Sequence, residues 1–400
     1  MVPNQKMTAL DSFVDPRAPI CYGILKPGEH VSDGVPVIKV RNIIGGRVLE
    51  DDLLRTSLQI HNQYKRAEVN QGDLLLTIRG TTGRVAIVPS SLAGANITQD
   101  TARIRVSSDD DPMYVFYALQ SPSVQQQIDL NTVGQAVKGI NIAEVRKLKI
   151  FHPDASEQKK IAQILSTWDK TITTTEQLLA NSQQQKKALM QQLLTGKKRL
   201  LDKNGARFSG EWKSYHLSHV AVIVMGSSPK SEAYNENGIG LPLLQGNADI
   251  KNRISAPRVF TSEITKECEI GDILLSVRAP VGTVAISEHK ACIGRGIAAL
   301  HAKPNFYQSF IYQFLLWFEP KWGSLSQGST FESINSDDIK NLKIKVPNFG
   351  EQQKIAAVLS TADQEISALQ QKLDALKQEK KALMQQLLTG RRRVKVEEAA

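Results

Sequence analysis

One stretch of about forty residues occurs twice in this chain, and it constrains the fold more than any other feature. The first copy runs from Glu157 to Arg199 and the second from Glu351 to Arg393. Both contain the run KKALMQQLLTG, and upstream of it IA, LST and D match in register. Each copy must therefore be the same structural unit, and we expect a chain built from two equivalent halves.

Apolar residues in both copies recur at alternating steps of four and three, with Lys380 interrupting the second series and Thr175, Ser182 and Lys186 the first. This spacing predicts a long helix that packs lengthwise against another helix, and two such seams in one chain pack most economically on each other. The seam positions are Ile161, Leu165, Trp168, Ile172, Leu179, Leu189 and Leu193 in the first copy, and Ile355, Leu359, Ile366, Leu369, Leu373, Leu376, Leu383 and Leu387 in the second.

Each copy ends at a glycine followed by three basic residues. Gly196 and Gly390 suit a left-handed C-cap, and the basic residues favour the negative end of a helix. A helix of about 38 residues would be about 57 Å long.

The 400 residues carry a formal net charge of +10, which fits a polyanionic partner without identifying one. Cys21, Cys268 and Cys292 are far apart and form no CxxC motif, so we expect free thiols in a reducing cytoplasm. The longest apolar runs are too short to cross a bilayer, and the chain does not begin with a charged-then-apolar signal. We expect a soluble cytoplasmic protein.

Two globular segments precede the two helices, one up to about Pro153 and the other from about Phe208 to Pro347. The first has strand-like stretches at 36–43, 73–80, 84–88 and 101–106 and a helical stretch at 113–128. The second repeats this order, since GDILLSVR at 271–278 corresponds to GDLLLTIR at 72–79. The globular segments have diverged much more than the helices. This suggests two different ligands and one shared type of partner, unless helical seams simply change slowly.

Several motifs together resemble the specificity (S, HsdS) subunit of type I restriction–modification systems over essentially the whole chain. They are EQKKIAQIL and EQQKIAAVL at the helix starts, KKALMQQLLTGKKRL and KKALMQQLLTGRRRV at the ends, SGEW at 209–212, GDILLSVRAPVGTVAI, and IGRGIAAL at 293–300. The resemblance implies an α+β fold. Two mixed α/β target recognition domains, 1–155 and 207–350, would be separated by spacer helices, 156–200 and 351–394, that form an antiparallel coiled coil with a pseudo-twofold internal repeat.

The resemblance also implies the function. Each recognition domain would read one half of a bipartite site on double-stranded DNA, with the two domains facing successive major grooves about 34 Å apart. The length of the coiled coil would set the gap between the two half-sites. The coiled coil would dock two methyltransferase (M) subunits, and restriction (R) subunits would join the full complex. The chain departs from this pattern at its start, because the first domain lacks the Trp-containing opening that Glu211-Trp212-Lys213 gives the second.

Catalytic motifs are missing from the sequence. It has no GxxxxGK[ST] phosphate loop and no Asn/Asp-Pro-Pro-aromatic motif, and its seven histidines show no metal-ligand spacing. We therefore expect a non-catalytic subunit with no catalytic residues, no cofactor and no metal site.

DNA contacts are expected from loop residues, because Arg pairs naturally with guanine, Asn or Gln with adenine, and Lys or Arg with phosphate. The candidates of the first domain are Lys39, Arg41, Asn42, Arg79, Thr81, Thr82, Arg84, Gln99, Gln135 and Lys138. Those of the second are Lys230, Gln245, Asn247, Arg278, Arg295, Gln327 and Ser329. Asp73 and Asp272 are expected to form turns, since a carboxylate repels phosphate. The basic tails 197–199 and 391–393 either cap the helices or contact spacer phosphates.

Two other interpretations stay open. The chain could be a coiled-coil scaffold with two modules that bind ligands other than DNA, in which case its binding would not depend on salt. It could also be a self-contained enzyme, which the missing motifs disfavour.

Overall fold

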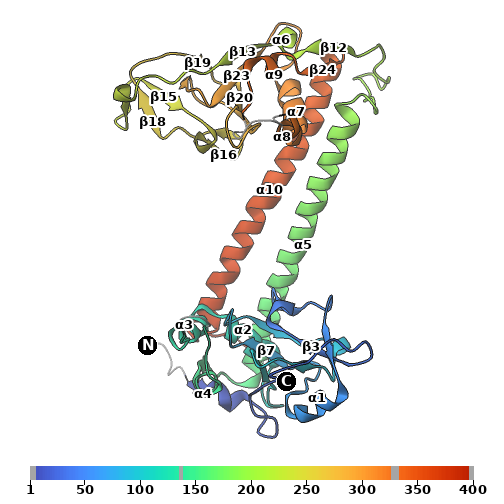
Figure 1. The fold of residues 1–400 in the computed structure, drawn as a ribbon, viewed down its shortest axis with the longest axis vertical. Helices are drawn as coiled ribbons and strands as arrows, with labels where there is room; N and C mark the ends of the chain where they lie inside the picture. The colour runs from blue at the N-terminus through green and yellow to red at the C-terminus, as the bar shows by residue number, and fades with distance from the viewer. Residues whose placement is uncertain (1–5, 135–137, 326–332, 396–400) are drawn as a thin grey trace. The chain divides into compact units, whose positions relative to one another are not determined.

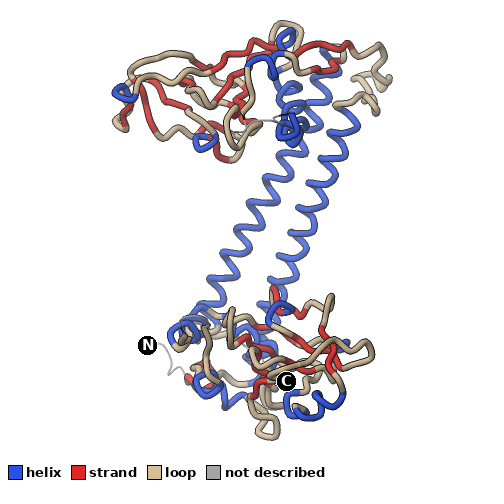
Figure 2. Tube along the Cα trace, in the orientation of Figure 1, coloured by secondary structure: helices blue, strands red, loops and turns tan. Residues whose placement is uncertain are grey.

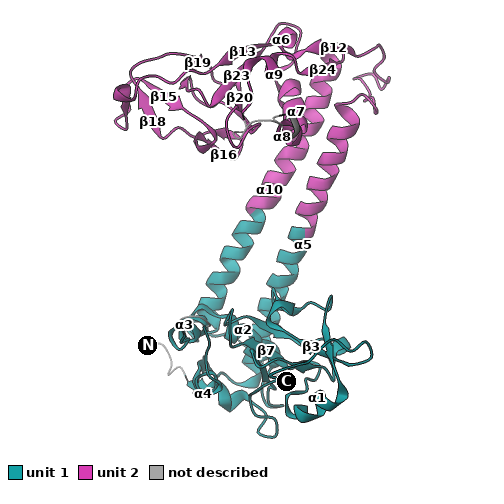
Figure 3. Ribbon diagram, viewed as in Figure 1, with its two compact units in different colours: residues 1–176, 372–400 teal, residues 177–371 magenta. Residues whose placement is uncertain are grey.

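The computed structural model describes residues 6–134, 138–325 and 333–395, and it is a mixture of helices and short strands (Figure 2). It divides into two compact units, coloured in Figure 3. Unit 1 comprises residues 1–176 and 372–400, and unit 2 comprises residues 177–371. The two long helices, α5 (Ala155–Leu193) and α10 (Phe349–Leu387), each contribute to both units.

In its described residues, unit 1 holds the strands β1 to β11 and the short helices α1 to α4, of which Figure 1 labels β3, β7 and the four helices. The strands are β1 (Met7–Ala9), β2 (Cys21–Tyr22), β3 (Val35–Ile38), β4 (Ile43–Ile44), β5 (Arg47–Val48), β6 (Leu54–Thr56), β7 (Leu74–Thr77), β8 (Val85–Ile87), β9 (Asn96–Ile97), β10 (Thr101–Ile104) and β11 (Lys149–Phe151). The helices are α1 (Leu58–Gln63), α2 (Pro112–Gln120), α3 (Pro122–Leu130) and α4 (Ile142–Lys147).

Unit 2 holds the remaining strands and short helices. The strands are β12 (Lys213–His216), β13 (Ala221–Met225), β14 (Tyr234–Asn235), β15 (Leu241–Leu244), β16 (Ile250–Lys251), β17 (Ile254–Ser255), β18 (Val259–Thr261), β19 (Glu267–Cys268), β20 (Ile273–Ser276), β21 (Val284–Ile286), β22 (Ala291–Ile293), β23 (Ile297–Ala302) and β24 (Lys343–Val346). The helices are α6 (Leu217–Val220), α7 (Gln308–Phe318), α8 (Trp322–Leu325) and α9 (Ser336–Lys340).

The expected internal repeat is visible in the sheets. The main sheet of unit 1 has the order β2-β10-β7-β8-β5-β4, and that of unit 2 has the order β13-β23-β20-β21-β17-β16. These orders match strand for strand. Each unit also has a two-stranded sheet, β1-β11 or β12-β24, and a further sheet that contains a parallel pair, β3 with β9 or β15 with β22.

Two expected elements are interrupted. The helix predicted over 113–128 is two helices, because Pro122 has no N–H to continue α2, and the Ser121 side chain instead accepts a hydrogen bond from the Val124 N–H to begin α3. The strand predicted over 36–43 stops at Ile38. A 3₁₀ turn, η2 (Val40–Asn42), follows it before β4.

The ends of the long helices complete the cores of the two units. In unit 1 the core beside β7 and β10 includes Ile161 and Leu165 from the start of α5 and Met384 and Leu387 from the end of α10. In unit 2 the corresponding residues are Ile355, Leu359, Met190 and Leu193. These end positions of the predicted seam therefore pack into globular cores. Between them the seam residues are buried or half-buried, as at Ile172, Leu179, Leu373, Trp168, Leu189, Ile366, Leu369, Leu376 and Leu383.

Within each unit, an ion pair between a buried glutamate and an arginine joins the start of one long helix to the tail of the other. In unit 1 the Arg393 guanidinium donates to Glu157 with an Nη2–Oε2 distance of 2.6 Å, and the carboxylate is 2% exposed. In unit 2 Arg199 donates through Nε and Nη2 to Glu351 at 2.7 Å each, and that carboxylate is fully buried. These hydrogen bonds raise the pKa of both arginines. The last residue of each basic tail thus contacts a carboxylate of its own unit.

The side chain of the glutamine beside each buried glutamate forms hydrogen bonds with backbone groups of the same unit. The Gln158 side chain accepts from the Asp111 N–H just before α2 and donates to the Pro153 carbonyl. Gln352 accepts from the Tyr307 N–H just before α7 and donates to Pro347. The repeated Glu-Gln dipeptide therefore fixes each long helix to the unit in which it begins.

Two lysines that interrupt the apolar seams pair with aspartates of the opposite helix. Lys380 contacts Asp169 at 2.5 Å in unit 1, and Lys186 contacts Asp363 in unit 2. Tyr117 also donates to Asp169, at 2.7 Å, and Gln313 donates to Asp363, at 2.8 Å. Residue numbers rise along one helix as they fall along the other, so the two helix segments in each unit run antiparallel.

The glycines that end the long helices lie in the left-handed region, with φ of 72° at Gly196 and 70° at Gly390, as predicted. An aromatic ring packs against each of them, Trp212 against Gly196 and Phe151 against Gly390. Phe151 thus does in unit 1 what Trp212 of the SGEW motif does in unit 2. The first domain lacks that motif, yet its strand β1 pairs with β11 as β12 pairs with β24.

Candidate nucleic-acid interface

The candidate residues of unit 1 follow the ends of strands that lie side by side. Strands β3 and β9 are parallel, and the Thr98 N–H donates to the Ile38 carbonyl at 3.2 Å just beyond them. The Ile78 N–H, just after β7, donates to the Asp100 carbonyl at 2.8 Å. Three candidates come next in these segments and so share one edge of the unit: Lys39, Gln99 and Arg79.

Two further segments join this edge. The Gly80 N–H donates to the Lys138 carbonyl at 2.8 Å, and Arg79 forms a backbone bridge with Gly139. From the other end of the 79–84 loop, Arg84 Nη1 donates to the Ile43 carbonyl at 3.2 Å, which links the loop to the segment after η2. We call the set Lys39, Arg41, Arg79, Thr81, Thr82, Arg84, Gln99 and Lys138 edge 1.

The side chains of edge 1 are accessible to a ligand. Arg41, Arg79, Thr81, Arg84 and Lys138 are exposed, and Lys39, Thr82 and Gln99 are half-buried. With five cationic side chains on loops, the edge can bind phosphates and present Arg or Gln to base edges.

Asn42 differs from the other candidates of unit 1. Its side chain is 4% exposed, and its Oδ1 accepts a hydrogen bond from the Lys39 N–H at 3.0 Å. In this conformation the amide holds the η2 turn and is not offered to a ligand. Asp249 of unit 2 does the same in the equivalent turn, η6 (Asn247–Asp249), by accepting from the Gln245 N–H at 2.8 Å.

The candidate residues of unit 2 meet around one open cavity of about 590 Å³. Gln245 follows β15, Arg278 follows β20, and Arg295 follows β22. All three side chains are exposed. The cavity lining includes these three residues and Asn247, and Lys230 lies between two further lining residues, Pro229 and Ser231. We call the set Lys230, Gln245, Asn247, Arg278 and Arg295 edge 2.

Close backbone packing sets the shape of this cavity. A Cβ on Gly296 would lie 2.2 Å from the Gln245 carbonyl oxygen, and one on Gly226 would lie 2.1 Å from the Gly294 carbonyl oxygen. Only glycine fits at these positions, which explains the second glycine of the IGRG sequence, next to Arg295. The glycines let the β22–β23 turn approach β15 closely enough for Gln245 and Arg295 to line one cavity.

Sequence reasoning missed Ser228 and Tyr234, which line the same cavity. The Ser228 hydroxyl accepts a hydrogen bond from the Arg295 N–H at 3.2 Å. A signal existed, because Ser228 lies two residues before the candidate Lys230 in the loop that follows β13. Three other candidates, Gln135, Gln327 and Ser329, lie outside the described residues.

Asp73 and Asp272 form turns, as expected. Asp73 accepts from the Asn70 N–H at 2.7 Å, and Asp272 accepts from the Glu269 N–H at 2.9 Å. Both lie at the beginning of their strands, at the opposite end from the candidate loops.

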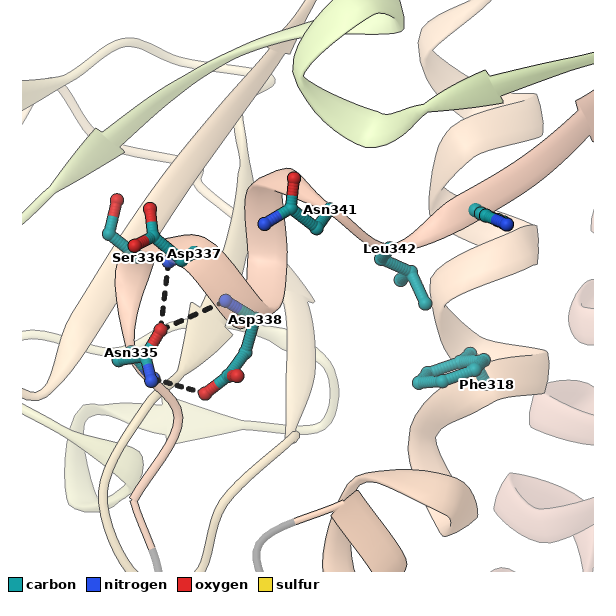
Figure 4. Close-up of a pocket in the computed structure, with 8 residues that line it drawn as sticks. Phe318, Asn335, Ser336, Asp337, Asp338, Asn341 and Leu342 are labelled. Atoms are coloured by element: carbon teal, nitrogen blue, oxygen red, sulfur yellow. Dashed lines mark hydrogen bonds between the residues drawn. The ribbon is translucent and has the colours of Figure 1, made fainter.

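The polar groups around another cavity of unit 2, of about 650 Å³, serve a helix start (Figure 4). The Asn335 side chain accepts from the Asp337 and Asp338 N–H groups at 2.8 and 2.9 Å, and Asp338 accepts from the Asn335 N–H at 2.9 Å. These contacts cap α9, so we do not count this cavity among the candidate sites.

Comparison with protein families decides the wider identity. The model described as "Type I restriction modification DNA specificity domain" matches residues 28–181 and again residues 209–378. The chain belongs to this family. It is a DNA specificity subunit of a type I restriction–modification system, a non-catalytic subunit that determines which DNA sequence is recognised. The scaffold and enzyme interpretations are not favoured.

A curated relative is similar to this chain in sequence, and two solved structures are similar to it in fold. The MjaX specificity subunit of a type I restriction enzyme from Methanocaldococcus jannaschii is 34% identical over 295 residues, which cover 71% of this chain and 69% of that protein. The solved HsdS subunit from Thermoanaerobacter tengcongensis is 25% identical, with a TM-score of 0.52 over 97% of both chains. A chain from a structural study of complex assembly and conformational transition in a type I R-M system has a TM-score of 0.62 and 24% identity, covering 96% of this chain and 97% of its own.

Membrane spans and metal clusters are both missing from the part of the chain that the structure describes. No helix in residues 6–134, 138–325 and 333–395 is long and apolar enough to cross a membrane. No group of three or more His, Cys, Asp or Glu side chains in these same ranges has a geometry that could hold a metal ion.

Proposed function

We propose that this specificity subunit reads a bipartite sequence on double-stranded DNA, with edge 1 contacting one half-site and edge 2 the other. The observation that supports the proposal most directly is that the residues of edge 2 lie around one cavity. Segments that are far apart in the sequence bring Gln245, Asn247, Arg278 and Arg295 to one cavity.

The chemistry of both edges supports DNA as the ligand. Arg and Gln can each form two hydrogen bonds with a base edge, and the neighbouring Lys and Arg side chains can contact phosphates. Two pairs of equivalent loops carry different candidate residues, whereas Arg79 and Arg278 are the same in both units. Lys39 follows β3 where Gln245 follows β15, and Gln99 follows β9 where Arg295 follows β22, which supports two different half-site sequences.

The long helices serve spacing and docking in this proposal. We keep the division into recognition domains 1–155 and 207–350 and spacer helices 156–200 and 351–394. The antiparallel segments of α5 and α10 within each unit support one continuous antiparallel coiled coil as the spacer. Its two similar helices, identical over the run KKALMQQLLTG, suit two methyltransferase subunits, and restriction subunits would join that complex in the cytoplasm.

Methylation mapping tests the proposal. The chain would be expressed with its cognate methyltransferase subunit in cells that carry random-sequence DNA, and modified bases would be read by single-molecule sequencing. We expect one split, asymmetric motif with adenine methylated on both strands. If the complex forms and its methyltransferase is active with another specificity subunit, yet no motif appears, the proposal is wrong.

A further inference from the structure

Unit 1 contains a strongly basic cavity that shares no residue with edge 1. It has a volume of about 470 Å³ and lies at the edge strand β2, beside the second half of β10. Six cationic side chains line it: Arg17, Lys65, Arg66, Arg103, Arg105 and Arg146.

Four of these cations already have carboxylate partners. Arg17 pairs with Asp15 at 3.0 Å, Arg105 with Asp73 at 2.7 Å, Arg146 with Asp11 at 3.7 Å, and Lys65 with Glu68. The other two, Arg66 and Arg103, have no carboxylate within 4.0 Å among the described residues. The cavity therefore carries uncompensated positive charge.

Arg103 is the more unusual of the two, because its side chain is buried. It is 4% exposed, its Nη2 donates to the Pro19 carbonyl at 3.0 Å, and its Nη1 reaches the Glu68 carbonyl only at 3.5 Å. Its Nε is buried and has no hydrogen-bond partner among the residues that the structure describes. A buried guanidinium without a counter-ion is unfavourable, and an anion in the cavity would compensate for it.

Arg66 lies at the same cavity and is exposed. Its guanidinium lies 5.7 Å from the centre of the Tyr22 ring, which holds the side chain beside β2. Burial raises the pKa of the neighbouring Cys21 thiol, so at neutral pH this group adds no negative charge to the cavity.

The fold itself does not require a buried arginine here. Arg103 pairs with Leu75 across the sheet, and in unit 2 the same register pairs Ala299 with Leu274. Cys21 faces Arg103, and Val224 faces Ala299. Unit 2 thus fills this place with small and apolar residues around its second core. The described part of unit 2 therefore has no arginine at the position equivalent to Arg103.

We propose that this cavity binds a phosphoryl group, held between Arg103 inside and Arg66 at the rim. An oxyanion can accept hydrogen bonds from several guanidinium N–H groups at once, and such charge-assisted bonds are the strong ones. The group is either a phosphate of the DNA backbone or part of a small free phosphorylated molecule. The second source does not depend on the proposed half-site reading.

The test uses the full chain and two variants, Arg103→Ala and Arg66→Ala. Arg103→Ala installs the residue that unit 2 carries at the equivalent sheet position. Lys340→Ala is the matched control, because Lys340 of unit 2 corresponds to Arg146 and is exposed. The probes are inorganic pyrophosphate, titrated at constant ionic strength against chloride, and a duplex that contains the target sequence, titrated over a range of salt concentrations.

For a free phosphorylated ligand, pyrophosphate binds the wild-type chain saturably. Both variants then bind it about tenfold more weakly or worse, and the control is unchanged. If the cavity binds a phosphate of the DNA backbone, the slope of log affinity against log salt becomes less negative by about 0.9 in both variants. The preferred sequence does not change.

The proposal is overturned if wild-type pyrophosphate binding is absent or non-saturable and Arg66→Ala also leaves the salt slope at the wild-type value. Arg66→Ala decides the outcome if Arg103→Ala does not fold. If the wild-type chain binds no duplex at all, the half-site proposal fails, and the pyrophosphate titration still decides whether the cavity binds a phosphoryl group.

Discussion

Arg295 shows how the backbone positions a single candidate side chain at the edge 2 cavity. Its backbone N–H donates to the Ser228 hydroxyl, glycines lie on both sides of it, and its exposed side chain lines the edge 2 cavity. The backbone is therefore fixed while the guanidinium is free to reach a base.

We predict that Arg295→Ala relaxes sequence preference in the second half-site only. Losing a bidentate contact to a base costs about 1–3 kcal/mol in discrimination at one position. Competition binding to duplexes varied at each position of both half-sites would measure this. Lys138→Ala on edge 1 serves as the comparison, since loss of a phosphate contact should weaken binding to all sequences about equally. An unchanged preference in the second half-site would remove Arg295 from the set of reading residues.

From residue type alone, the position of a candidate on an exposed loop was easier to predict than whether its side chain is available to DNA. Arg79 and Arg278 follow equivalent strands, and both are exposed on loops as expected. Asn42 was expected beside them, but it holds a turn from a buried position. An amide can stabilise a turn or contact adenine, and only the path of the backbone decides between these roles.

At the scale of elements, the ion pair of Glu351 and Arg199 joins the first residue of the second repeated stretch to the last residue of the first. The sequence predicts that the basic tails either cap the helices or contact DNA phosphates. Neither prediction paired Arg199, the last residue of its tail, with Glu351, which lies 152 positions away. Pairing over such a distance leaves no periodic signal in the sequence.

We predict that Arg199→Ala lowers the free energy of unfolding by about 3–5 kcal/mol, because it leaves the fully buried Glu351 carboxylate without its counter-ion. Adding Glu351→Gln should recover part of this loss. Chemical denaturation followed by circular dichroism measures both effects. Lys198→Ala removes the exposed neighbouring charge and should change stability by less than about 0.5 kcal/mol. An equal effect of the two alanine variants would contradict the assignment.

The polar pairs between α5 and α10 should set the register of the two helices. Asp169→Lys would face Lys380 with a second cation and remove the acceptor of the Tyr117 hydroxyl. The charge exchange Asp169→Lys with Lys380→Asp should restore part of the stability, with a coupling of about 0.5–3 kcal/mol in a double-mutant cycle. Thermal unfolding of the four proteins gives this coupling. Zero coupling would mean that the pair does not contribute to the register.

The long helices were the most predictable elements, since apolar residues at alternating steps of four and three over this length are typical of helices that pack lengthwise. Two features escaped prediction. The ends of the seam, such as Leu165 and Leu387, belong to globular cores, because an apolar position does not say which surface covers it. The helix expected over 113–128 is divided at Pro122, a signal that the sequence did contain.

At the scale of the whole molecule, one topology occurs twice with different residues at its loops. The order of the main sheets, the Glu-Gln dipeptide and the ion pairs of the buried glutamates are the same in both units. Edge 1 and edge 2 carry different residues, and at the place where unit 1 has Arg103 of the basic cavity, unit 2 has Ala299. A constant frame with two variable edges is the arrangement that a reader of two unrelated half-sites needs.

The most direct test of this account exchanges one recognition domain. Residues 1–153 would be replaced by the equivalent segment of a family member with a known target, and both proteins would be expressed with the methyltransferase subunit. The methylated motif of each would then be read by single-molecule sequencing. We predict that one half of the motif changes to that of the donor, while the other half and the gap stay as they were. A change in both halves, or in neither, would contradict the claim that each unit reads its own half-site.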